Sequence, residues 1–126
     1  MRVALVALGG AIGSVARYGV GALAAQLLGA TFPWGTLLVN LTGSFLIVVV
    51  MHVALSGTAI SLELRIFLTT GIMGGFTTYS SFNFETMRLW QQGSVLLGFA
   101  NIGATLVGCM IMGALGLLAG RLIGGV

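Results

Sequence analysis

Apolar residues fill four long segments of the chain, and short polar or turn-forming stretches separate these segments. The segments run over residues 3–28, 35–55, 64–91 and 95–122. Each is long enough to cross the roughly 30 Å hydrocarbon core of a bilayer, which takes about 20 helical residues. The pattern predicts an all-α membrane protein, one domain over residues 1–126 with four spanning helices. Ser61 is expected to cap the third helix at its start.

The third segment is interrupted by glycines and polar residues at the depth of the membrane interior. Gly74 and Gly75 are followed by hydroxyl side chains that compete for backbone hydrogen bonds. An unsatisfied polar group costs several kcal/mol in hydrocarbon, so such a stretch belongs inside protein or beside a cavity. We expect an ordinary helix over residues 66–73 and a break between residues 74 and 80, whose free carbonyls and amides suit ions. The alternative is an unbroken helix whose hydroxyls bond back to the preceding turn.

Glycines recur at four-residue spacing in three of the segments. Such stripes of small residues let membrane helices approach each other closely. Four helices of this size barely enclose an ion path, so a homo-oligomer is expected. The pairs are Gly9 with Gly13, Gly71 with Gly75, and Gly116 with Gly120.

The composition supports a membrane protein and excludes several other classes. Hydrophobic residues make up 58% of the 126 residues and charged residues 6%, whereas soluble domains carry about 25% charged residues. The net charge of +3 comes from dispersed arginines, which do not form the basic patch of a nucleic-acid-binding protein. One cysteine and one histidine leave no intrachain disulfide and no zinc-type cluster. No nucleophile–base arrangement indicates an enzyme.

Polar side chains at helical spacing mark candidate positions along an ion path. Thr36 and Asn40 are four residues apart in the second segment and face the same direction. In the fourth segment, Asn101, Thr105 and Cys109 repeat this spacing. A polar stripe on an apolar helix indicates a pathway, with hydrogen bonding between helices as the alternative.

The charged and aromatic residues in the spans have a structural and a functional interpretation each. Arg17, past the middle of the first helix, either extends to the headgroups or supplies a positive charge that attracts anions to a vestibule. Glu85 and Arg88 are three residues apart and can pair, or Glu85 is a proton or cation site. Tyr79 and Phe82 either pack in the core or turn their positive ring edges toward an anion.

Three stretches of the chain resemble the Fluc (CrcB) family of fluoride channels. They are residues 9–18 (GGAIGSVARY), 35–43 (GTLLVNLTG) and 70–82, which end in the run TTYSSF. Together with the length and the four spans, the resemblance covers essentially the whole chain. Tyr79 stands where the family pattern has phenylalanine, so the ring is kept and a hydroxyl is added.

The resemblance implies a passive channel that exports fluoride from a prokaryotic cell across its plasma (inner) membrane. It implies a dual-topology homodimer, in which two copies lie antiparallel in the bilayer and form two pores. It also implies a structural Na⁺ at the dimer centre, bound by backbone carbonyls of Gly74 and Thr77. The implied pore residues are Asn40, Tyr79, Ser80 and Phe82, with Asn101 and Thr105 on the fourth helix and Thr36 beside Asn40.

Two other functions compete with a fluoride channel. A small proton-coupled exporter of drugs or cations would need a carboxylate within the membrane, for which Glu85 is the candidate. A non-transporting subunit would use the polar motif only to join helices. The few fixed charges in the spans favour a channel, because conduction requires binding weak enough to release the ion.

Overall fold

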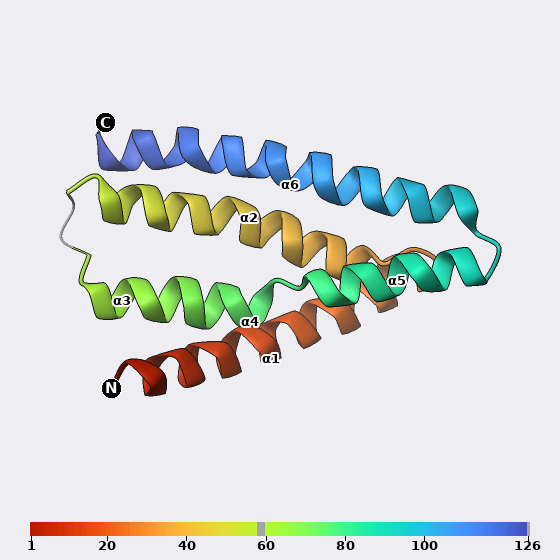
Figure 1. The fold of residues 1–126 in the computed structure, drawn as a ribbon, viewed down its shortest axis with the longest axis horizontal. Coiled ribbons are helices and arrows are strands. Elements are labelled where there is room, and N and C mark those ends of the chain that lie inside the picture. Colours follow the sequence, from red (N-terminus) through yellow and green to blue (C-terminus); the bar gives the residue numbers. More distant parts are fainter. Residues whose placement is uncertain (58–59, 126) are drawn as a thin grey trace.

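The computed structural model describes residues 1–57 and 60–125, and every regular element in this part of the chain is a helix (Figure 1). Three helices are long and apolar enough to cross a membrane: α1 (Arg2–Leu28), α2 (Trp34–Leu55) and α6 (Val95–Gly124). The remaining span consists of α3 (Leu62–Ile66), η1 (Phe67–Met73), α4 (Gly74–Phe76) and α5 (Tyr79–Gln91). The expected all-helical fold with four spans is confirmed.

The third span is broken, but it is hardly bent. The helix stops after Phe76, and Thr77 and Thr78 have extended backbones, with ψ of 156° and 118°. The joined span nevertheless bends by 14°. The expected break is confirmed and is narrower than predicted, because Gly74 and Gly75 remain helical.

The prediction of an ordinary helix just before the break is wrong. Phe67–Met73 forms a π-helix, whose hydrogen bonds skip one residue more than those of an α-helix. Within it, the Thr69 hydroxyl donates to the carbonyl oxygen of Arg65 at 2.8 Å. A side chain that enters the backbone ladder in this way is a recognised cause of helix distortion.

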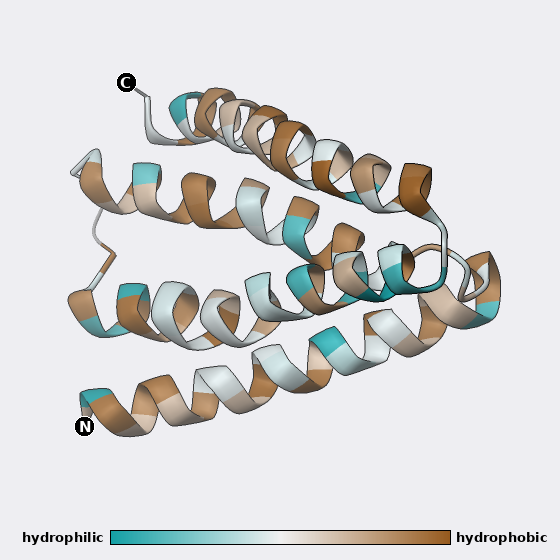
Figure 2. Cartoon of the chain, turned by 45° about the vertical axis from the view of Figure 1, so that its right-hand side comes forward, coloured by the Kyte–Doolittle hydropathy of each residue, from teal (hydrophilic) through white to brown (hydrophobic). Residues whose placement is uncertain are grey.

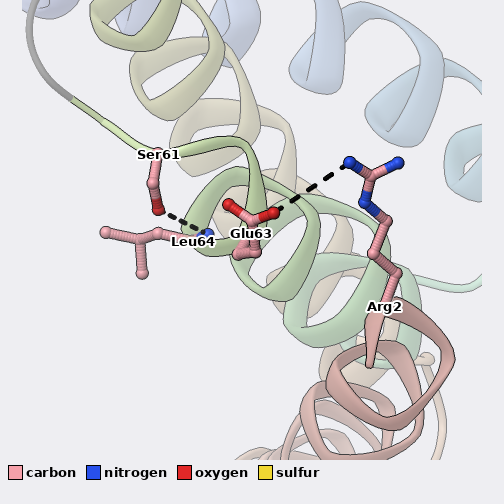
Figure 3. Close-up of polar contacts among 4 residues, drawn as sticks. All are labelled: Arg2, Ser61, Glu63 and Leu64. Atoms are coloured by element: carbon pink, nitrogen blue, oxygen red, sulfur yellow. Dashed lines mark hydrogen bonds and ion pairs between the residues drawn. The ribbon is translucent and has the colours of Figure 1, made fainter.

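The start of the third span is capped and tied to the first helix. The Ser61 hydroxyl oxygen accepts a hydrogen bond from the Leu64 amide at 3.2 Å, which confirms Ser61 as the N-cap (Figure 3). Glu63 in the first turn lies 4.0 Å from the Arg2 guanidinium (Figure 3). Residues 58 and 59 of the predicted loop lie outside the described residues. The N-terminus and the start of α3 therefore share one end of the bundle with the C-terminus (Figure 1).

Glycines set the distance between the helices. The first helix packs on η1 and α4, where a Cβ atom added to Gly9 would lie 2.8 Å from the Cα atom of Gly71. Helix α6 packs along α2, where a Cβ at Gly116 would lie 2.5 Å from the Phe45 carbonyl oxygen. The predicted close packing at the glycine stripes is confirmed, because a methyl group has no room at these positions.

Several polar side chains are buried inside the bundle, and many large apolar side chains are exposed on its surface. Within the described residues, the buried hydrophobic side chains are Ala24, Leu37, Val39, Phe82 and Leu89, and the buried polar ones are Asn40, Thr78, Thr86, Asn101 and Thr105. Many large apolar side chains on the long helices are exposed, and Figure 2 shows hydrophobic positions recurring along these helices. This distribution suits lipid, which solvates apolar groups and cannot hydrogen-bond to polar ones.

The glycine contacts make Gly13→Ala a destabilising change. The new methyl group would overlap the carbonyl oxygen of Ile72 and lie 2.9 Å from the amide nitrogen of Phe76. Overpacking of this kind costs about 1–3 kcal/mol, so we expect a lower unfolding midpoint in detergent. Gly10→Ala is the matched control, since no described atom lies within 4 Å of the added Cβ. Equal stability of the two variants would contradict this account of the helix packing.

Candidate functional site

Asn40 on α2 makes two hydrogen bonds to the backbone of Thr78, at the break of the third span. Its carboxamide oxygen accepts from the Thr78 backbone amide at 2.8 Å, and its carboxamide nitrogen donates to the Thr78 carbonyl at 3.0 Å. Both residues are 8% exposed. An extended residue inside a span has no helical partner for its backbone groups, and Asn40 supplies both partners.

Of the two hydroxyls at the break, that of Thr77 bonds a carbonyl of the preceding turn and that of Thr78 caps the following helix. The Thr77 hydroxyl donates to the carbonyl of Met73 at 2.9 Å. The Thr78 hydroxyl oxygen accepts from the Ser81 amide at 3.2 Å and so caps α5. The back-bonding named above as the alternative does occur, but an unbroken helix is excluded, because Thr78 caps a new helix.

A groove of about 390 Å³ opens beside the break. Its walls come from one stripe of α2, from the break with the first turn of α5, and from α6. Thr105 on α6 is 7% exposed, and its hydroxyl oxygen is buried without a hydrogen-bond partner in the described part of the chain. The lining residues are Asn40, Gly43, Ser44, Ile47, Thr77, Thr78, Tyr79, Phe82, Thr105, Leu106, Cys109 and Met110.

Two aromatic rings stand at the start of α5 and line this groove. Tyr79 and Phe82 meet edge to face, with ring centroids 5.4 Å apart and planes at 69°. Phe82 is 5% exposed, whereas Tyr79 is 75% exposed and extends from the surface of the chain. Ser80 is also exposed, with its hydroxyl oxygen 3.4 Å from that of Thr78. The edge of one ring carries the partial positive charge that an anion would contact.

Asn101 lies in the interface between α5 and α6 and not among the groove residues. Its side-chain nitrogen donates to the Thr86 hydroxyl at 3.0 Å, and that hydroxyl donates to the Phe82 carbonyl at 2.8 Å. Asn101 is 1% and Thr86 2% exposed. This relay fixes the turn of α5 that carries Phe82, whereas Thr105, one turn further along α6, does line the groove.

Thr36 and Glu85 meet about one helical turn from the Asn40 contact. The Thr36 hydroxyl donates to one Glu85 carboxylate oxygen at 2.8 Å, and the other oxygen is buried without a partner among the described residues. An ion pair of Glu85 with Arg88, one of the two interpretations given above, does not form within 4.0 Å in the described part of the chain. Both residues instead line a separate cavity of about 180 Å³ near the α1–α2 loop. Arg17 is partly buried on α1, outside both cavities.

Backbone carbonyls rather than side chains could hold a cation at the break. No group of three or more His, Cys, Asp or Glu residues gathers anywhere in residues 1–57 and 60–125. The Thr78 amide bonds Asn40 and not the carbonyl of Gly74, which is left at an exposed helix end. Thr77, the residue that follows α4, has an extended backbone. Neutral carbonyls released in this way are the donors that unwound membrane helices offer to Na⁺.

Two residues at or beside the groove escaped the sequence prediction. Thr86 was not singled out, although it is four residues from Phe82, the spacing at which it bonds that residue's carbonyl. Ser44 lines the groove and continues the four-residue spacing of Thr36 and Asn40. A full count of polar residues at this spacing would have found Ser44.

The fold and the groove define a small helical membrane protein with a groove beside a broken helix. Residues 4–117 match the family model described as "CrcB-like protein, Camphor Resistance (CrcB)". The chain belongs to this family, and the expected resemblance is confirmed.

Curated relatives share about half of their residues with the chain. A protein of Sorangium cellulosum is 51% identical over 95% of each chain, and one of Anaeromyxobacter sp. (strain K) is 52% identical over 87% of each. A protein of Thermus thermophilus is 56% identical over 75% of this chain and 74% of its own. All three carry the name fluoride-specific ion channel FluC.

Asn40→Ala is expected to destabilise the protein, because it leaves the amide and the carbonyl of Thr78 buried and unpaired. Each unsatisfied group costs about 1–3 kcal/mol. Thr42→Ala, at an exposed position of the same helix, is the control and should change little. Unfolding in detergent measures both variants. A loss for Asn40→Ala no larger than the control's would show that another group can take over its role.

Thr86 and Asn101 are expected to be energetically coupled. Thr86→Val keeps the shape and removes the shared hydroxyl, so the contribution of Asn101 should fall in that background. Coupling between membrane helices through one hydrogen bond is about 0.6 kcal/mol on average and reaches about 1.7 kcal/mol. A double-mutant cycle of Thr86→Val and Asn101→Leu, followed by unfolding in detergent, gives this number. Additive effects would mean that the relay does not link α5 to α6.

Proposed function

We propose that this protein is a passive, fluoride-selective channel that exports fluoride from a prokaryotic cell across its inner membrane. The observation that supports it most directly is the groove at the break of the third span. Its lining combines hydroxyl, amide and aromatic groups with aliphatic ones, and includes no charged residue among those described. The name shared by the relatives agrees with this function.

The chemistry of the groove suits a small, strongly hydrated anion. Moving bare fluoride into a low-dielectric interior costs tens of kcal/mol, so a path must replace its water with donors. Thr105 lines the groove and has a hydroxyl that nothing in the described chain engages, and the exposed residue Tyr79 adds another hydroxyl to the lining. Ser80 is exposed beside Tyr79 and is not itself among the lining residues. The second N–H of the Asn40 carboxamide adds another donor. Neutral donors bind weakly enough for the ion to leave.

The proposal includes a homodimer with two antiparallel copies and two pores. A single chain leaves the groove open on one side, with Tyr79 75% exposed at its edge. Because lipid cannot satisfy the polar lining, a second copy is the natural cover. The arginines permit both orientations. Arg2 begins α1, Arg65 lies in α3 and Arg121 in the last turn of α6, and these three elements meet at the end of the bundle that holds both termini (Figure 1). Arg88 lies in the last turn of α5, at the other end (Figure 1).

A structural Na⁺ at the dimer centre completes the proposal. The carbonyls of Gly74 and Thr77 would hold it, and its charge would join the ends of two broken helices. The use of the Thr78 amide by Asn40 supports this role, because it leaves a carbonyl at the break without its helical partner. The ion is a structural element, and the conduction path does not pass through it.

The geometry speaks against a proton-coupled exporter. Such a transporter needs its carboxylate on the substrate path. Glu85 lies outside the groove and is engaged by Thr36. We therefore expect fluoride efflux that its own gradient drives and that needs no proton gradient.

Fluoride efflux from proteoliposomes, followed with a fluoride electrode, tests the function. Vesicles loaded with fluoride should empty rapidly once valinomycin balances the charge with K⁺, and chloride-loaded vesicles should not. Thr105→Val should lower the fluoride rate by about tenfold, the effect of losing about 1.4 kcal/mol of stabilisation at one donor.

The Thr105 substitution separates conduction from folding. Removing an unpaired buried hydroxyl should leave the fold as stable or more stable. Thr105→Ser keeps the donor and should keep most of the flux. Absence of fluoride efflux, or chloride efflux at the same rate, would rule out the proposed function. A Thr105→Val protein with full flux would remove Thr105 from the path.

A further inference from the structure

The α6 wall of the groove carries the cysteine of this chain. Cys109 is four residues beyond Thr105, or about 6 Å along the helix, and lines the same groove. Its thiol is free, and the residue is partly exposed. Cys109 thus lines the same groove as Thr105, whose buried hydroxyl is unpaired in the described part of the chain.

A second observation marks this wall as one that receives a ligand. Thr105 is 7% exposed, and its hydroxyl oxygen is buried without a partner in the described part of the chain. Buried polar atoms in proteins are almost always paired, so an unpaired hydroxyl that lines a groove indicates a partner from the groove itself. Cys109 lies one helical turn from that partner's position.

The groove has no fixed charge of its own among the described residues that line it. The lining side chains contribute neutral dipoles to the field that an ion meets there, and the proposed Na⁺ at the break adds a positive charge at a separate place. A charge added at Cys109 would change the field inside the groove strongly, because the surroundings screen it poorly at this depth. A negative charge would repel an anion, and a positive charge of the same size would not.

We propose that Cys109 is a covalent modification site in the anion path, at which a small thiol-reactive electrophile carrying a negative charge closes the groove to fluoride. This inference rests on the proposed function. A volume of about 390 Å³ leaves room for a small reagent to reach the thiol.

The reaction with a methanethiosulfonate is balanced without a further reactant. The Cys109 thiol loses its proton to the buffer, and the thiolate sulfur attacks the sulfenyl sulfur of the reagent. A new S–S bond forms, the bond between the sulfenyl and sulfonyl sulfurs breaks, and methanesulfinate leaves with the electron pair. The sulfonatoethyl reagent leaves a negative group on Cys109, and the trimethylammonioethyl reagent leaves a positive group of similar length.

Fluoride efflux before and after each reagent tests the proposal on the full-length protein in proteoliposomes, with intact mass measuring the extent of modification. The negative adduct is expected to lower efflux at least tenfold and the positive adduct to lower it less. Fluoride in the bath should slow the reaction, because the ion and the reagent share the groove. Efflux from Cys109→Ser, compared with itself before treatment, should not change. Gln92→Cys in that background places the thiol in an exposed turn and should be modified without loss of efflux.

The outcomes separate this inference from the proposed function. No modification by mass, or full modification with unchanged efflux, overturns the modification site while fluoride efflux itself still supports the channel. Equal inhibition by both adducts overturns the electrostatic closure. Absence of fluoride efflux before any reagent overturns the proposed function first. Inhibition that depends on Cys109 and on the sign of the adduct's charge supports the proposal.

Discussion

The arrangement at the centre of this protein depends on how the backbone amide and carbonyl of one residue, Thr78, are hydrogen-bonded inside a membrane span. Its backbone is extended, so neither half of the third span can take its amide or its carbonyl. In lipid, two such groups left alone would cost several kcal/mol, enough to close the break into a helix. Asn40 on another span supplies both partners. The break persists because the bundle holds α2 beside it.

The consequences spread outward from this contact. Because the Thr78 amide bonds the side chain of Asn40, the carbonyl of Gly74 at the end of the first half-span is left without its helical partner. The second half-span, α5, begins as a new helix that the Thr78 hydroxyl caps. The new helix carries Tyr79 and Phe82 into the groove wall. Asn101 and Thr86 then lock the same turn of α5 from behind. Most of the buried polar groups thus hold the break and the turn of α5 beside the groove, and Thr105 lines the groove with a hydroxyl that has no partner in the described part of the chain.

Close helix packing makes these long-range bonds possible. Side-chain carboxamides and hydroxyls are short, so α2 must approach the break within a few ångströms. Gly43 allows this approach, since a Cβ atom there would overlap the methyl group of Thr77. The glycine stripe of α1 supports the third span from its other side. The glycines that let the helices approach each other therefore also set the geometry of the polar site.

Much of this arrangement follows from the sequence alone. Four spans, the break, the Ser61 cap and the glycine contacts were predictable, because each depends on local composition or on spacing along one helix. The π-helix at Phe67–Met73 was not, since the spacing of the residues in this segment fits an α-helix equally well. The choice of Thr36 rather than Arg88 as the partner of Glu85 was not predictable either.

The sequence by itself determined which residues are too polar for lipid and how they are spaced on each helix. Spacing reports the face of a helix, whereas the family resemblance brought Asn40, Tyr79, Phe82 and Thr105 into one list. Only the tertiary structure decided which atoms meet, such as Asn40 with Thr78, 38 residues apart, or Thr36 with Glu85, 49 apart. It also moved Asn101 into a helix interface. The physical reason is that hydrogen bonds need partners within about 3 Å, and that distance is set by how whole helices pack.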